Sequence, residues 1–209
     1  MTFSSSLSVA DGLLVLDASV VINVIGSGSS ERILSALPTP PLVSSYAIQE
    51  IVGGGRNDAS IITALLDRNV MIRADLTHPA NVVFASLVSG STSDTLGDGE
   101  AATIAIAKDI GGVAMIDEKQ GWRIAGGRFP DLQLATTVDL LALPSISECL
   151  GQSEFRQAVL NALTEARMQV REHQLEWVIA QIGVEAAVGC RSLARLMRVR
   201  SAEPHKAVG

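Results

Sequence analysis

The chain has 209 residues, of which 47% are apolar and 18% charged, so it can bury a sizeable core and is unlike a disordered chain. Its net charge of −6 makes it a poor generic binder of nucleic acid. No apolar run approaches the roughly 18 residues that a membrane-spanning helix needs, and Cys149 and Cys190 lack the spacing of a zinc site or disulfide framework. The start, MTFSSSLSVADG, has no basic segment before an apolar run, so we expect no signal peptide and a cytoplasmic protein without a membrane segment.

The first predicted strand lies at residues 13–16, where the segment LLVLDASVVINVI begins as a continuous apolar run that breaks at Asp17. A GSGSS turn and a short helix, ERILSAL, follow. Prolines then precede a short strand at residues 42–43, and Ser44 or Ser45 can cap a helix that ends at a triple glycine.

The same alternation of strands and helices continues beyond the triple glycine. Asn57 or Asp58 can cap the next helix, and Asp98 is the expected N-cap of a later helix that Gly111 and Gly112 terminate. In chain order the pattern predicts helix 59–69, strand 70–76, helix 79–90, helix 98–110, strand 113–116, helix 121–127, strand 132–137 and a helix from residue 138. Strands that alternate with helices predict an α/β fold with a parallel sheet.

The pattern changes at Glu154 to one or two helices without strands. We therefore divide the chain into a body of residues 12–150 and a helical extension with a basic tail, residues 151–209. Residues 1–150 hold 16 acidic and 8 basic side chains, a net charge of −8, whereas the extension holds 6 and 8, a net charge of +2. The tail RSLARLMRVRSAEPHK has the charge run of a nucleic-acid binder, although such runs are more often a solvated helix face. The apolar face of the extension must pack on the body, on a second copy or on a partner.

Acidic residues lie at the ends of several predicted elements. Asp17 directly follows the first strand, and Asp117 directly follows strand 113–116. Parallel α/β sheets place their binding sites beyond the carboxyl ends of the strands. Glu50 lies in the helix after the second strand, and Glu100 lies in the first turn of the helix that leads to the Asp117 strand. We expect all four carboxylates to face the same crevice.

Three or four carboxylates cannot stay ionised together without a counter-charge, because like charges raise each other's pKa. Oxygen ligands select hard cations, so the site is expected to take Mg²⁺ or Mn²⁺. Such a site can activate a water molecule for phosphodiester hydrolysis. The catalytic set is predicted as Asp17, Glu50, Glu100 and Asp117, with Asp17, Glu100 and Asp117 as metal ligands and with Ser19 and Asn23 orienting a carboxylate or a metal-bound water.

Simpler interpretations of these residues remain open. Glu50 can be a surface acid, and Glu100 can favour the dipole of its helix. Ser19 and Asn23 can cap the helix that follows them. Asp17 is the hardest to explain in this way, because an unpaired acid next to an apolar strand is costly.

Other polar residues have expected positions outside this set. Glu118 is expected to point away from the crevice into solvent. His78, His173 and His205 show no ligand spacing and are interpreted as non-catalytic. Asp17 could instead accept a phosphoryl group, but that chemistry predicts a D-x-D signature where this chain has D-A-S.

The segments LVLDASVVINV, SSYAIQEI, LGDGEAATIAIAKDIGGVAMIDEKQGWRIA and LATTVDLLAL resemble those of PIN-domain proteins. The most similar subtype is the bacterial group with the motif LG-x-GE-A-x-x-IA-x-A, which is allied to the VapC toxins. The resemblance covers about residues 12–150. It implies a three-layer α/β/α sandwich with a parallel sheet, RNA cleavage that depends on Mg²⁺ or Mn²⁺, and, as in toxin members, an antitoxin partner and a homodimer. The family's acidic positions correspond to Asp17, Glu50, Glu100 and Asp117, and its first hydroxyl residue corresponds to Ser19.

The chain departs from this subtype at two places. A basic residue is common at the position of Trp122, and here Arg123 stands one residue later as the candidate RNA contact. The extension is longer than a minimal PIN domain requires, and it could serve as a dimerisation element, a built-in substitute for an antitoxin, or an RNA-binding arm. The alternative function is a non-catalytic PIN-fold binding or regulatory module, although the presence of all four acids argues against a degraded site.

Overall fold

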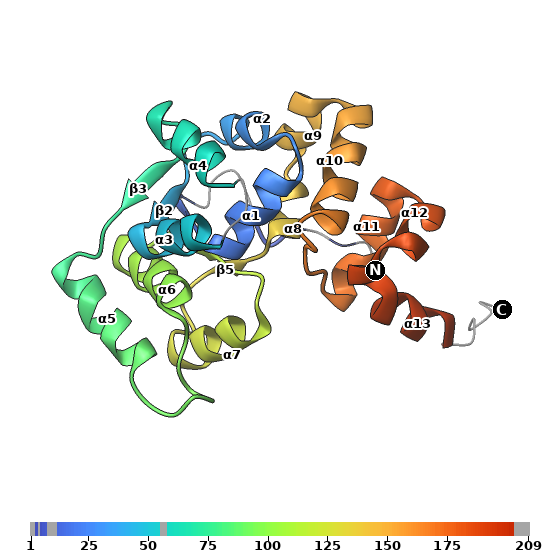
Figure 1. Cartoon of the computed structure of the whole chain (residues 1–209). Helices are drawn as coiled ribbons and strands as arrows, with labels where there is room; N and C mark the ends of the chain where they lie inside the picture. The colour runs from blue at the N-terminus through green and yellow to red at the C-terminus, as the bar shows by residue number, and fades with distance from the viewer. Residues whose placement is uncertain (1–2, 4, 8–11, 55–57, 203–209) are drawn as a thin grey trace.

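The computed structural model describes residues 3, 5–7, 12–54 and 58–202 (Figure 1). Asn57, His205 and the end of the basic tail lie outside these residues. The five predicted strands are confirmed and form one parallel sheet, in the order β3-β2-β1-β4-β5. They are β1 (Leu14–Leu16), β2 (Leu42–Ser44), β3 (Ile72–Ala74), β4 (Val113–Met115) and β5 (Leu134–Ala135).

Helices connect the strands and continue after the last one. They are α1 (Ala18–Gly26), α2 (Ser30–Ser35), α3 (Ser45–Gly53), α4 (Asp58–Asp67), α5 (His78–Val88), α6 (Asp98–Ile110), α7 (Lys119–Arg128), α8 (Thr137–Leu141), α9 (Pro144–Leu150), α10 (Gln152–Thr164), α11 (Leu175–Ile182), α12 (Val184–Gly189) and α13 (Ala194–Ala202), with 3-10 turns η1 (Glu172–Gln174) and η2 (Arg191–Leu193). Within the described ranges, no helix has both the length and the apolar composition needed to cross a membrane.

The helix termini follow local capping chemistry, with one correction. The Ser44 hydroxyl accepts a hydrogen bond from the Ala47 amide at 3.0 Å and caps α3. The prediction that Asp98 caps α6 was wrong: Asp98 is its first helical residue, and the N-cap is Gly97, which has the extended backbone that this position requires. Gly111 ends α6 in the left-handed conformation, with φ 63°, as expected.

The side chains of the strands alternate between two cores on opposite faces of the sheet. Leu14 and Leu16 point into a core shared with α1 to α4 and with α8 to α11. Val15 and Ala114 point into a second core, which α5, α6 and α7 cover. Figure 1 shows α5, α6 and α7 gathered on one side of the strands. This arrangement is a three-layer α/β/α sandwich, as the resemblance implies.

The helical extension packs on the body. Phe155 and Val159 of α10 and Val178 of α11 are buried in the same core as Leu16 of the central strand. Helix α10 contacts both α1 and α9. Of the three surfaces on which the apolar face of the extension could pack, the body is the one used in this structure. The division near residue 150 stays a prediction.

Candidate functional site

Two aspartates follow the two central neighbouring strands. Strands β1 and β4 pair with Leu16 opposite Met115, and the backbone amide of Asp17 donates to the Met115 carbonyl at 3.1 Å. Asp17 and Asp117 therefore lie at one edge of the sheet, as predicted. The chain winds in opposite directions from this pair of strands, and such a switch point is where open α/β sheets bind their ligands.

Asp117 is held by donors from two other elements. Its Oδ2 accepts hydrogen bonds from Asn23 Nδ2 at 2.6 Å and from Thr137 Oγ1 at 2.5 Å, and its Oδ1 accepts from the Thr137 amide at 2.8 Å. Burial raises the pKa of Asp117 to about 6, although these hydrogen bonds lower it. Sequence reasoning found Asn23 but missed Thr137, whose signal was a hydroxyl two residues after β5, the strand next to β4.

Asp17 is the N-cap of α1 and is itself held by Ser19. Its Oδ2 accepts from the Ser19 amide at 3.2 Å and from the Ser19 hydroxyl at 2.7 Å. Burial raises the pKa of Asp17, and these hydrogen bonds partly offset the effect. The alternative that Ser19 or Asn23 caps α1 was wrong: Ser19 positions Asp17, and Asn23 positions Asp117.

Glu50 and Glu100 each lie against a glycine. Glu50 Oε1 accepts from the Gly99 amide at 3.0 Å, and a Cβ atom at Gly99 would lie 2.6 Å from Glu50 Oε2. A Cβ atom at Gly121 would lie only 2.0 Å from Glu100 Oε1. Both glycines therefore leave the space that the glutamate side chains occupy. Burial raises the pKa of Glu50, and the negative charge of Asp17 adds to the effect.

Glu100 has a strongly perturbed environment. Burial raises the pKa of Glu100 to about 8, with further contributions from the charges of Asp17, Glu118 and Glu50. Its Oε1 is buried against Gly121, whose backbone amide lowers the pKa of Glu100, but it accepts no hydrogen bond of good geometry among the described residues. Glu118 is solvent-exposed, as expected, and its negative charge contributes to the raised pKa values of Glu100 and Glu50. Glu118 follows Asp117 directly, so the same strand end carries both.

The four carboxylates fit a divalent cation by their chemistry. They come from four elements and offer oxygen ligands, and within the described residues none of them forms an ion pair with a lysine or arginine. No group of three or more acidic, histidine or cysteine side chains in the described ranges is already drawn together as a metal site. Like charges keep such side chains apart until a cation neutralises them. The orphaned oxygen of Glu100 and the raised pKa values are the features that a hard cation would satisfy.

The extension adds a cation beside this cluster. The guanidinium of Arg171 lies 4.0 Å from the ring centroid of Trp122, whose Nε1 donates to the Ile116 carbonyl at 2.7 Å. Burial lowers the pKa of Arg171, and the negative charges of Asp117 and Asp139 oppose that shift. Arg171 therefore places a positive charge near Asp117. Its guanidinium lies over Trp122, which occupies the position where the resemblance predicts a basic residue. Sequence reasoning missed Arg171, because no local pattern connects it to Trp122.

Arg123 lies on another side of α7. Its guanidinium donates to the Ser93 carbonyl and lies 3.9 Å from the carboxylate of Asp94. These contacts direct it towards the segment before α6. Its role as an RNA contact stays a prediction.

The family model DUF3368, described as a PIN domain, matches residues 13–184. The chain belongs to the PIN-domain family. No curated protein and no solved structure matches it. PIN domains are generally nucleases, so membership supports a nuclease-type function. The matched PIN region includes Asp17, Glu50, Glu100 and Asp117, and it continues past residue 150 to include Arg171.

Proposed function

We propose that this PIN-domain protein is a metal-dependent endoribonuclease that hydrolyses RNA phosphodiesters at its carboxylate cluster. The observation that carries the proposal is the convergence of acids with raised pKa values at the switch point of the sheet. Asp17 and Asp117 are buried, Glu100 is half-buried and Glu50 is exposed, and no ion pair neutralises them in the described part of the chain. Carboxylates whose pKa values are shifted in such a crevice are typical of a functional site.

The residues have separate parts in this proposal. Asp17, Glu100 and Asp117 would hold Mg²⁺ or Mn²⁺, which when bound polarises phosphate oxygens and lowers the pKa of water. Asp117 accepts three hydrogen bonds, and a carboxylate has about four lone-pair sites, so one site is left for the cation. Glu50, whose carboxylate accepts a hydrogen bond from the Gly99 amide, would accept a proton from an attacking water.

The test is cleavage of a mixed pool of structured RNA with Mg²⁺, with Mn²⁺ and with chelator. Glu100→Gln removes the charge of an acid whose pKa is strongly raised and should abolish metal-dependent cleavage. The matched control is Glu148→Gln, which removes the same charge from an exposed position on α9 and should cleave like the wild type.

Two results would contradict the proposal. Cleavage by the folded Glu100→Gln protein at the wild-type rate would exclude a role for the cluster. If the folded wild type cleaves under none of the three conditions, the chain is a non-catalytic PIN-fold binding or regulatory module.

The toxin role, the antitoxin partner, the homodimer and the cytoplasmic location rest on the resemblance and the composition, and they stay predictions. Growth arrest upon expression, relieved by Glu100→Gln, is the expected sign of a toxin. Unimpaired growth with an active enzyme would contradict that role.

A further inference from the structure

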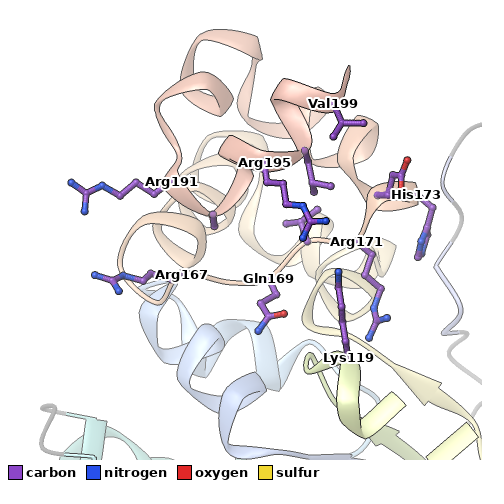
Figure 2. Close-up of a pocket in the computed structure, with 12 residues that line it drawn as sticks. Lys119, Arg167, Gln169, Arg171, His173, Arg191, Arg195 and Val199 are labelled. Carbon is purple, nitrogen blue, oxygen red and sulfur yellow. The ribbon is translucent and has the colours of Figure 1, made fainter. Parts of the chain in front are cut away.

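A cavity of about 630 Å³ lies between the start of α7 and the C-terminal helices. Its lining is strongly basic, with Lys119 from the body and Arg167, Arg171, Arg191 and Arg195 from the extension. Figure 2 shows Lys119, Arg171 and Arg195 extending into one gap, whereas Arg167 and Arg191 point outward at its rim. Five basic side chains on one cavity contrast with the acidic body of the protein.

Within the described residues, these cations lack acidic partners. Elsewhere on the surface, arginines are paired with acids, namely Arg32 with Glu154, Arg68 with Glu31, Arg73 with Asp75, Arg123 with Asp94 and Arg200 with Glu176. None of the five lining cations forms such a pair within the described ranges, and Nε and Nη2 of Arg171 are buried there without a hydrogen-bond partner. Among the described residues that line the cavity, Glu172 is the one acid. The cavity therefore has an excess of positive charge available for an anionic ligand.

The cavity adjoins the carboxylate cluster. Lys119 is the first residue of α7 and stands two residues after Asp117. Arg171 lines the cavity, and its charge acts on Asp117. A chain of phosphates that reaches the cluster can therefore continue into the cavity without crossing the acidic surface of the body.

We propose that this basic cavity binds the phosphate backbone of the RNA strand next to the scissile bond, so that the extension is part of the substrate-binding surface. This inference rests on the proposed function for the identity of the ligand. The inference explains how a chain with a net charge of −6 would bind RNA, because the positive charge of the cavity lies next to the carboxylate cluster along the path of the strand. These cations offset the negative potential of the acidic body, which would otherwise repel the RNA strand.

The experiment measures binding of a fluorescent single-stranded RNA by anisotropy, with chelator present so that no cleavage occurs. The test variant is Arg191→Gln with Arg195→Gln, at two exposed positions on the cavity. The control is Arg198→Gln with Arg200→Gln, which removes the same charge from the same C-terminal segment outside this cavity. The slope of log Kd against log salt should fall by about 1.4 in the test variant, because each phosphate contact to a single strand contributes about 0.7. The control should keep the wild-type slope.

A second readout separates this inference from the proposed function. A small phosphodiester, bis(p-nitrophenyl) phosphate, is too short to reach from the cluster along the cavity, so the test variant should hydrolyse it with Mn²⁺ at the wild-type rate. Weakened RNA binding in a protein whose wild type cleaves nothing would support the cavity and contradict the nuclease. Wild-type RNA affinity and salt slope in the test variant would overturn the inference and point to an acidic protein as the occupant of the cavity.

Discussion

The two aspartates of the cluster are each held by a neighbour that fixes their orientation. Asp117 depends on Asn23 and Thr137, and Asp17 depends on Ser19. A buried carboxylate that loses such a donor becomes harder to ionise, because no water replaces the lost hydrogen bond. Residues that never touch substrate can thus set the charge of those that do.

Thr137→Val tests this dependence. The variant removes a hydrogen bond to an ionised group, so we expect a loss of about 1.5–3 kcal/mol in the free energy of unfolding at pH 8. The loss should be smaller at pH 5, where Asp117, whose pKa is about 6, is largely protonated. Urea unfolding at both pH values measures it, with Thr63→Val on exposed α4 as the control. An equal loss at the two pH values would mean that the Thr137 hydroxyl does not act through the charge of Asp117.

The raised pKa of Glu100 predicts how the free energy of unfolding depends on pH. Burial raises its pKa from the ordinary 4.5 to about 8, so between these values the folded state binds more protons than the unfolded state. The free energy of unfolding should therefore fall as pH rises from 5 to 8 in the presence of chelator. Denaturant unfolding across this range measures it. A free energy that stays constant would contradict the raised pKa.

A bound cation should restore the stability lost at pH 8. Binding to the folded state alone contributes about 2.7 kcal/mol when Mn²⁺ is present at 100 times its Kd. Glu100→Gln should both flatten the pH dependence and lose the Mn²⁺ effect, whereas Glu148→Gln should behave like the wild type. A melting temperature of the wild type that Mn²⁺ leaves unchanged would contradict metal binding at the cluster.

At the scale of elements, helix α7 must approach α6 closely enough for Glu100 to lie against Gly121. Gly121→Ala places a Cβ atom where Glu100 Oε1 now lies, 2.0 Å away, so the glutamate must leave its position. We expect loss of RNA cleavage and of Mn²⁺ stabilisation in a protein that still folds. Gly126→Ala, in the same helix with no atom near the added Cβ, should instead stabilise the protein by about 0.4–1 kcal/mol. Wild-type activity in Gly121→Ala would show that the glutamate position is not needed.

At the scale of the whole molecule, the body and the extension share one core. Phe155 is buried against Trp177, with ring centroids 6.2 Å apart, and belongs to the same cluster as the central strand. Phe155→Ala should cost about 3–5 kcal/mol, and hydrogen exchange of the amides in β1 and β4 should report the same loss. Val188→Ala, at a position 66% exposed on α12, should change stability by less than about 0.5 kcal/mol. Unchanged exchange in β1 and β4 would show that the extension unfolds independently.

Local patterns in the sequence predicted most of the fold. Continuous apolar runs marked the central strands β1 and β4, because a strand covered on both faces needs apolar side chains at every position. The same runs located Asp17 and Asp117, since an acid next to a buried strand stands out. The Asp98 cap was mispredicted because the choice between adjacent cap residues depends on backbone conformation, which composition does not determine.

The sequence by itself determined the order of the elements and the parallel sheet, because both depend on patterns of residues that are neighbours in the chain. Only the tertiary structure decided which side chains meet. Asn23 reaches Asp117 across 94 residues of sequence because β1 and β4 are adjacent in the sheet, and that adjacency is set by the packing of helices on both faces. The guanidinium of Arg171 packs over the Trp122 ring because the extension is buried in the same core as the body. Contacts of this kind come from the way whole surfaces pack, so no local pattern could predict them.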